Sequence, residues 1–143
     1  MGQAIPLAQK RPLILVIDDD PDLLQLFHDV LTEECDYVVT PRPDQAPSLD
    51  EIRCLAPNVM IIDHRLARGV LGWDVVRELR AADDLIHLPI LFCTADRQHL
   101  ALVADDLTAL RVTPLVKPFS VDQLVGDVAE ALQLQGIDPS PCP

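Results

Sequence analysis

Four short apolar runs in this sequence end in residue types that can do chemistry. In chain order, the residues at their C-terminal ends are Asp18-Asp19-Asp20, Asp63, Thr94 and Lys117. An ionised carboxylate is costly to bury without partners, so we expect each Asp where its run emerges from the core. Ligands of parallel α/β sheets bind at the C-terminal ends of the strands. We therefore interpret the acid pair, the third acid, the hydroxyl and the amine as one site.

Three carboxylates at one sheet edge require a cation. Two carboxylates about 4 Å apart repel by roughly 4 kcal/mol at an effective dielectric constant of 20. Oxygen-only ligands favour Mg²⁺, which keeps several of its waters and accepts phosphate oxygens. The acid cluster therefore predicts Mg²⁺, or Mn²⁺, as the cofactor.

The elements that must position these residues follow from apolar patterning. The predicted strands are 13–17, 37–40, 59–63, 90–93 and 112–116. The predicted helices are 21–34, 48–55, 72–82, a stripe from Leu100 to Leu110, and one that begins after Ser120 and ends at Gly136. This alternation is (βα)5, which implies an α/β fold with a doubly wound five-stranded parallel sheet and helices on both faces.

Local signals support the predicted helix starts. Asp20 is a helix-capping residue type that stands directly before the first helix. Ser48 with Glu51, and Ser120 with Gln123, have the spacing of capping boxes.

Length and composition indicate one compact domain. The chain has 143 residues, of which 49% are hydrophobic, and a mean hydropathy of +0.20. We expect a loose tail over 1–11, the domain over 12–135 and a Pro-rich tail over 136–143. No apolar stretch approaches the ~20 residues needed to span a membrane, and the first ten residues are too short and polar for a signal peptide. These features predict a cytoplasmic protein.

Charge and cysteine usage exclude several functions. A net charge of −12 argues against binding nucleic acid or an anionic membrane and favours a protein partner. The four cysteines, Cys35, Cys54, Cys93 and Cys142, are scattered without a CxxC pair. We therefore expect reduced thiols, and neither a structural zinc site nor a disulfide framework.

Over about residues 13–134, the chain resembles the receiver domain of bacterial two-component response regulators. The features that agree are the pair Asp18-Asp19, then Asp63, Thr94-Ala95, Lys117-Pro118-Phe119, and the order of the five units. Each feature alone is weak, but together, in order and at the family's separations, they are specific. The resemblance implies the flavodoxin-like receiver fold with strand order 2-1-3-4-5.

The resemblance also implies roles for the site residues. Asp19, Asp63 and the backbone carbonyl of Arg65 would bind the metal directly, and Asp18 would act mostly through water. Asp63 would attack phosphorus and become the aspartyl phosphate. Lys117 would hold one phosphoryl oxygen as a point charge, and Thr94 would hydrogen-bond another.

The resemblance also bears on one peptide bond and on two residues beside the site. It implies a cis Lys117–Pro118 bond, an isomer that proline makes accessible. It also places Arg65 and Asp96 at the rim of the site, where we expect them to tune how long the phosphoryl group lasts.

The function implied is a phosphorylation-dependent signalling switch. Such a receiver accepts a phosphoryl group from a histidine kinase or a histidine phosphotransfer protein and acts on a downstream protein target, which the sequence does not identify. We therefore do not expect an enzyme that turns over an external substrate.

The sequence departs from the family at three places. The loop 64–71 has one residue more than the usual spacing to Gly72, and Ala67 stands where proline is common. Pro114 occupies a position where many receivers carry an aromatic switch residue. We therefore expect phosphorylation to act through the loop 64–71 and the helix after Thr94.

The histidines have simpler interpretations. His64 follows Asp63 on an extended strand, so its side chain should point away from that of Asp63. His28, His87 and His99 lack metal-ligand spacing and are assigned to surface or helix positions.

Two alternatives remain open at this stage. One is a receiver-like module that binds proteins without being phosphorylated, against which the complete acid, threonine and lysine set argues. The other is a phosphohydrolase of the haloacid-dehalogenase type, because Asp18-x-Asp20 fits the nucleophile motif of that family. Its usual hydroxyl residue would fall at Asp22, and no acidic motif follows Lys117.

Overall fold

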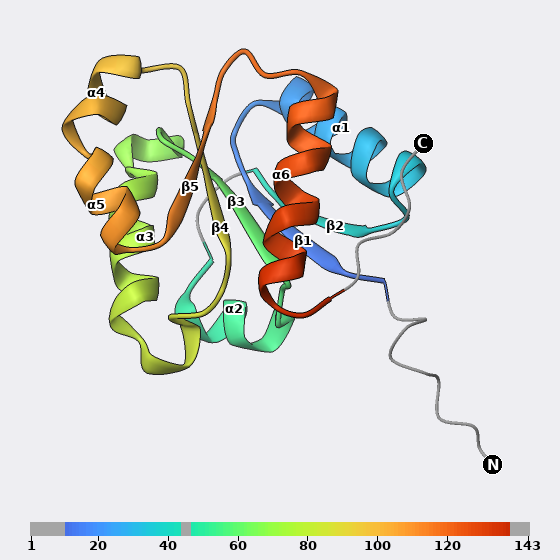
Figure 1. Cartoon of the computed structure of the whole chain (residues 1–143), viewed down its shortest axis with the longest axis horizontal. Coiled ribbons are helices and arrows are strands. Elements are labelled where there is room, and N and C mark those ends of the chain that lie inside the picture. Colours follow the sequence, from blue (N-terminus) through green and yellow to red (C-terminus); the bar gives the residue numbers. More distant parts are fainter. Residues whose placement is uncertain (1–10, 44–46, 138–143) are drawn as a thin grey trace.

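Five parallel strands form a single sheet at the centre of the molecule (Figure 1). The structure is a computed structural model that describes residues 11–43 and 47–137. The strands are β1 (Leu13–Ile17), β2 (Val38–Arg42), β3 (Val59–Asp63), β4 (Ile90–Thr94) and β5 (Val112–Val116). Their spatial order is β2-β1-β3-β4-β5, which confirms the predicted order.

The helices follow the strands in alternation. They are α1 (Pro21–His28), the π-helical turn η2 (Asp29–Glu34), α2 (Leu49–Leu55), the 3₁₀ turn η3 (Ala67–Gly69), α3 (Gly72–Ala81), the 3₁₀ turn η4 (Asp83–Leu85), α4 (Arg97–Leu102), α5 (Ala104–Ala109) and α6 (Val121–Leu134). Within these described ranges, no helix is both long and apolar enough to cross a membrane.

Alternate residues of β1, β3 and β4 face two separate cores. On β3, Val59 and Ile61 pack in one core with residues of α1 and α6, whereas Met60 and Ile62 pack in the other with residues of α2, α3 and α5. All five residues of β3 and of β4 are buried. This two-sided burial explains why both strands appear in the sequence as continuous apolar runs.

Strand β5 lies at an edge of the sheet and tolerates a proline. Thr113 and Pro114 are exposed, while Val112 and Leu115 are buried. Proline lacks the backbone N–H that a residue of a central strand donates to its neighbour, so Pro114 is tolerated because β5 is an edge strand.

The predicted helix caps are present. The Asp20 carboxylate accepts hydrogen bonds from the backbone N–H groups of Asp22 and Leu23. Ser48 and Glu51 form a full capping box, and the Ser120 hydroxyl accepts from the Gln123 N–H.

The single helix expected over the stripe from Leu100 to Leu110 is wrong. Two short helices, α4 and α5, meet at Val103, whose φ and ψ of −106° and 12° are not helical. Leu100, Val103 and Leu107 nevertheless all pack against the same core. A 3.6-residue pattern reports which face is buried, and it does not require that the helix be continuous. Most of the two expected tails, 1–11 and 136–143, lies outside the described residues, which include only Arg11, Gly136 and Ile137 of them.

Candidate functional site

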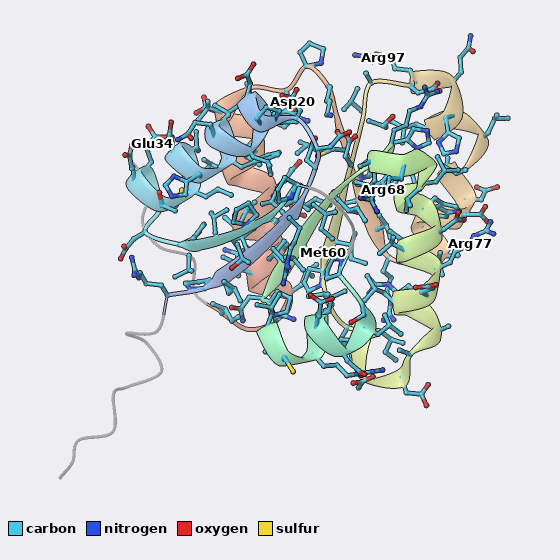
Figure 2. All side chains as sticks on the ribbon, turned by 180° about the vertical axis from the view of Figure 1, so that it is seen from behind. Asp20, Glu34, Met60, Arg68, Arg77 and Arg97 are labelled. Carbon is cyan, nitrogen blue, oxygen red and sulfur yellow. The ribbon has the colours of Figure 1, made fainter. Side chains whose placement is uncertain are left out.

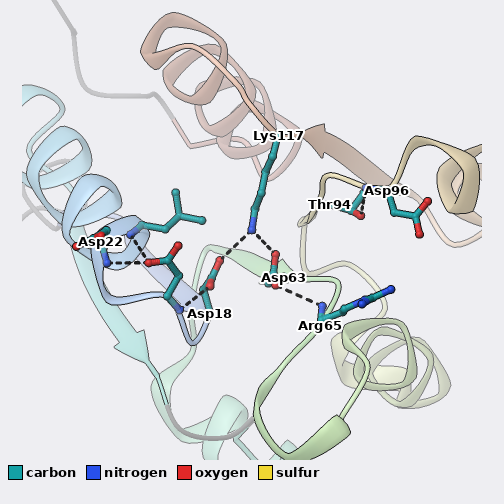
Figure 3. A network of polar contacts seen from close by, with 9 residues as sticks. Asp18, Asp22, Asp63, Arg65, Thr94, Asp96 and Lys117 are labelled. Atoms are coloured by element: carbon teal, nitrogen blue, oxygen red, sulfur yellow. Dashed lines mark hydrogen bonds and ion pairs between the residues drawn. The ribbon is translucent and has the colours of Figure 1, made fainter.

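The site lies at the C-terminal ends of β1, β3 and β5, and its central contact joins Lys117 to Asp63. Lys117 Nζ is 2.6 Å from Asp63 Oδ1 and 3.6 Å from Asp18 Oδ2. Figure 3 shows the Lys117 side chain directed between the two carboxylates. Burial alone would lower the pKa of Lys117, but the hydrogen bond and the charges of Asp63 and Asp18 raise it above its ordinary value. The amine is therefore charged at neutral pH.

Asp18 is the most buried of the acids, with 2% of its surface exposed. Burial is the main reason that its pKa is raised, and it is opposed by the hydrogen bond from the Asp20 N–H to Asp18 Oδ1. The negative charge of Asp63 raises the pKa further, Lys117 lowers it, and Asp19 raises it. Burial and the neighbouring negative charges thus outweigh the hydrogen bond and Lys117, and the raised pKa means that the charged form of Asp18 is disfavoured.

The three acids form the cluster that a divalent cation needs. Carboxylate oxygens of Asp18, Asp19 and Asp63 lie within 4.8 Å of one another. Residues 11–43 and 47–137 contain no other such group of three potential ligands. Asp18 Oδ2 is buried and has no hydrogen-bond partner in this part of the chain, only the 3.6 Å ion pair with Lys117. An oxygen-only set with an unsatisfied buried oxygen fits Mg²⁺.

The loop 64–71 is held tightly against the end of β3. Arg65 donates its backbone N–H to Asp63 Oδ2 at 3.3 Å, and the Gly72 N–H donates to the His64 carbonyl at 2.9 Å. A Cβ on Gly72 would collide with the Asp63 carbonyl oxygen, so only glycine fits there. Within the loop, Arg68 has a left-handed φ of 63°.

Thr94, at the end of β4, is 2% exposed. Its hydroxyl oxygen accepts a hydrogen bond from the Asp96 backbone N–H at 2.9 Å, and the Asp96 carboxylate in turn accepts from the His99 N–H at the start of α4. This last bond is the main reason that the pKa of Asp96 is lowered. Within the described residues, no hydrogen bond joins the Thr94 side chain to Asp63 or Lys117. The site therefore brings together Asp18, Asp19, Asp63 and Lys117, with Thr94 tied to α4.

The turn after β5 orients the lysine. The Lys117–Pro118 peptide bond is cis, which confirms that implication of the resemblance. The Lys117 N–H donates to the Thr94 carbonyl at 2.8 Å, and Phe119 stacks on Phe27 of α1 at 5.8 Å between ring centroids.

One contact near the site escapes sequence analysis. The rings of His64 and His99 lie 4.3 Å apart, although the two residues are separated by 34 others. The His64 ring also meets Phe92, which belongs to the core formed with α2, α3 and α5, and this agrees with a side chain directed away from that of Asp63. Its pKa is lowered, mainly by burial and then by His99 and Arg65. The only sequence signal is that Asp96 stands three residues before His99, which is the spacing of a helix cap.

Taken together, the strand order and the positions of the acids, the lysine and the threonine match the arrangement that the resemblance to receiver domains implies. The family model of the response regulator receiver domain matches residues 14–129, and the chain belongs to this family.

Individual relatives agree with this assignment. The chain is 27% identical over 138 residues to the sensor histidine kinase TmoS of Ectopseudomonas mendocina, covering 94% of this chain and 14% of the relative. It is 32% identical over 136 residues to the DNA-binding response regulator MtrA of Mycolicibacterium smegmatis, covering 91% of this chain and 54% of the relative. The chain thus spans only part of these relatives.

Solved structures share the fold. A putative response regulator from Chloroflexus aurantiacus superposes with a TM-score of 0.74 at 27% identity, covering 87% of this chain and 99% of that one. The chemotaxis protein CheY4 of Vibrio cholerae gives 0.69 at 22% identity, covering 85% and 99%. At this lower identity the similarity concerns the fold alone.

Proposed function

We propose that this receiver accepts a phosphoryl group on Asp63 in a Mg²⁺-dependent reaction and so acts as a signalling switch. The observation that carries the proposal is the 2.6 Å contact between Lys117 Nζ and Asp63 Oδ1 beside the Asp18–Asp19 pair. A carboxylate held by an amine, next to further acids that need a cation, is suited to receive a group that carries its own negative charges.

The residues have separate roles in this proposal. Asp19, Asp63 and the backbone carbonyl of Arg65 would hold Mg²⁺, and Asp18 would act mostly through water. When bound, the metal neutralises charge on the transferring phosphoryl oxygens. Lys117 would hold one phosphoryl oxygen, and the Thr94 hydroxyl, which already accepts from the Asp96 N–H, still has its own proton to donate to another.

The reaction is a single phosphoryl transfer. An oxygen of Asp63 attacks phosphorus, the P–O or P–N bond to the donor breaks, and its electron pair leaves with the donor. Because the chemistry is mostly positioning and charge neutralisation, no general base on Asp63 is required.

We infer that the unit 12–135 exchanges phosphate with a histidine kinase or a histidine phosphotransfer protein and does not turn over an external substrate. TmoS, a relative, is itself a sensor histidine kinase. A protein target downstream would read the phosphorylated state. The net charge of −12 favours a protein over nucleic acid as the direct partner of this unit.

The haloacid-dehalogenase alternative is disfavoured by the position of Asp20. That mechanism needs the second acid of Asp18-x-Asp20 near the reacting group, whereas the Asp20 carboxylate is engaged as the cap of α1. The structure offers no observation that favours the alternative.

Intact mass after incubation with phosphoramidate and Mg²⁺ tests the proposal. We expect one added phosphoryl group in the wild type, none in Asp63→Asn, and one in the control Asp20→Asn, since asparagine can still cap α1. Phosphorylation of Asp63→Asn to the wild-type level, or a label that maps to Asp18, would contradict the proposed function.

A further inference from the structure

The contact between His64 and His99 connects the phosphoacceptor strand to helix α4. Their ring centroids are 4.3 Å apart with an interplanar angle of 43°. His64 is 8% exposed, and its ring also meets Phe92 edge-on at 5.6 Å. The buried Nδ1 atoms of both histidines lack hydrogen-bond partners among the described residues, so this is a packing contact between rings.

At one end of this contact, His64 directly follows Asp63, the proposed phosphoacceptor. It stands between Asp63 and Arg65, and its N–H donates to the Cys93 carbonyl at 2.8 Å. Its carbonyl accepts from the Gly72 N–H. The backbone of His64 is thus hydrogen-bonded on both sides. When its ring is held in place by Phe92 and His99, the peptide bond between Asp63 and His64 is held in place as well.

On the other side, His99 is connected to Thr94. The His99 N–H donates to the Asp96 carboxylate, and the Asp96 N–H donates to the Thr94 hydroxyl. A continuous path therefore runs from Asp63 to Thr94. It passes along the chain to His64, through the ring contact to His99, and through the two hydrogen bonds of Asp96 to the Thr94 hydroxyl. In Figure 3, Thr94 and Asp96 appear on the opposite side of Asp63 from Asp18.

Helix α4 is weakly held, so these few contacts matter. It has six residues, none of them buried, and Leu102 at its end is 82% exposed. A helix this short has little stability of its own. Strand β5 supplies no aromatic ring here, because the register partner of Phe92 is Pro114 on the exposed edge.

We propose that His99 is a positioning residue: its ring contact with His64 makes the first turn of α4 and the backbone at Asp63 move as one unit. The proposal rests on the proposed function for its signalling role, because the movement of Thr94 toward a phosphoryl oxygen would then be transmitted to α4 and back to the loop 64–71. Coupling of this kind acts equally in both directions.

The test uses substitutions that change only the ring. His99→Ala removes the ring that contacts His64, keeps the backbone N–H that donates to Asp96, and places a good helix former in α4. His99→Phe restores a ring. His87→Ala is the matched control, because His87 is exposed and lies at the opposite ends of the strands, just before β4.

The first measurement is amide hydrogen exchange of His64 and Gly72 without any ligand. We expect exchange in His99→Ala to be roughly fivefold faster or more, with His99→Phe and His87→Ala close to the wild type. Unchanged exchange in His99→Ala, or an equal effect in His87→Ala, would overturn the proposal.

The second measurement adds beryllofluoride, a phosphoryl mimic, with Mg²⁺. In the wild type we expect altered protection of residues 97–102. His99→Ala should still bind the mimic but lose this response, and His99→Phe should regain it. A wild-type response in His99→Ala would overturn the coupling. If the wild type failed to bind the mimic, the proposed function would be contradicted. The first measurement would still show whether the ring contact holds the backbone at Asp63, because it needs no ligand. Arg68 in the loop 64–71 and Arg97 at the start of α4 are labelled in Figure 2.

Discussion

Gly72, the first residue of α3, is packed directly against the backbone carbonyl of Asp63. The requirement for glycine here is steric, because the obstacle is the backbone of Asp63, the proposed phosphoacceptor. We predict that Gly72→Ala lowers the free energy of unfolding by roughly 1–3 kcal/mol and slows phosphorylation.

Gly126 is the control for that prediction. It is exposed in the middle of α6 with open space around it, so Gly126→Ala should stabilise the protein by about 0.5–1 kcal/mol. Chemical unfolding of both variants tests the pair. A Gly72→Ala protein as stable as the wild type would show that the contact is not required.

Removal of the Lys117 amine should destabilise the protein without metal. In Lys117→Met the carboxylates of Asp18 and Asp63 lose their shared cation, and we expect a loss of roughly 1–3 kcal/mol in the free energy of unfolding. Millimolar Mg²⁺ should recover more stability in this variant than in the wild type. Arg11→Met, which removes an exposed ion pair with Asp36, should cost less than about 1 kcal/mol. Equal losses in the two variants, measured by urea unfolding, would contradict the prediction.

The raised pKa of Asp18 predicts a pH dependence with a defined sign. As the pH rises from 3.8, the unfolded chain releases the Asp18 proton while the folded protein still holds it, so this group makes the free energy of unfolding fall until the pH passes its folded pKa. Asp18→Asn removes this cost and should be more stable than the wild type at pH 7 without divalent ions.

Urea unfolding of wild type and Asp18→Asn at about pH 4 and at pH 7 measures the effect. The advantage of Asp18→Asn should grow with pH, and its gain from Mg²⁺ should be smaller than that of the wild type. The exposed Asp22→Asn serves as control. An advantage that shrinks toward neutral pH would refute the assigned sign.

Arg65 and Asp96 should control the lifetime of the phosphoryl group. Arg65 is exposed, and its positive charge is the smallest of the causes that lower the pKa of Asp96, after the hydrogen bond from the His99 N–H and the charges of the two histidines. We predict several-fold faster loss of the phosphoryl group in Arg65→Ala and in Asp96→Asn, because attacking water gains access.

Loss of a radioactive phosphoryl label over time measures this lifetime. Arg77→Ala is the control, because it also removes an exposed arginine. Arg77 lies on α3, 6.0 Å from the ring centroid of Trp73, and is not one of the site residues. Lifetimes equal to that of the wild type in both rim variants would dispose of the role.

Strand β5 should respond little to phosphorylation. Pro114 has neither the length nor the rotamers of an aromatic side chain that could move inward with Thr94. We therefore expect beryllofluoride to change amide exchange mainly in 64–71 and 97–109, and to leave 112–116 and 121–134 nearly unchanged. The opposite distribution would show that output follows β5 and α6.

The sequence alone determined the elements and the candidate site residues. The apolar runs 13–17 and 59–63 predict the bounds of β1 and β3 because burial on both faces leaves a local pattern that needs no knowledge of the neighbours. Ser48 and Glu51 predict the start of α2 for the same reason, since a capping box forms within one turn. The strand order came from the resemblance, because apolar runs do not specify which strands pair.

The tertiary structure alone decided the break at Val103, the steric contact of Gly72 with Asp63, and the ring contact of His64 with His99. Each of these depends on where segments distant in sequence come to lie. A helical stripe is equally compatible with one helix or two, and no spacing in the chain brings position 64 to position 99. Such contacts arise only when α3 and α4 pack on the same face of the sheet, since close packing fixes the distances between elements that local patterns leave undetermined.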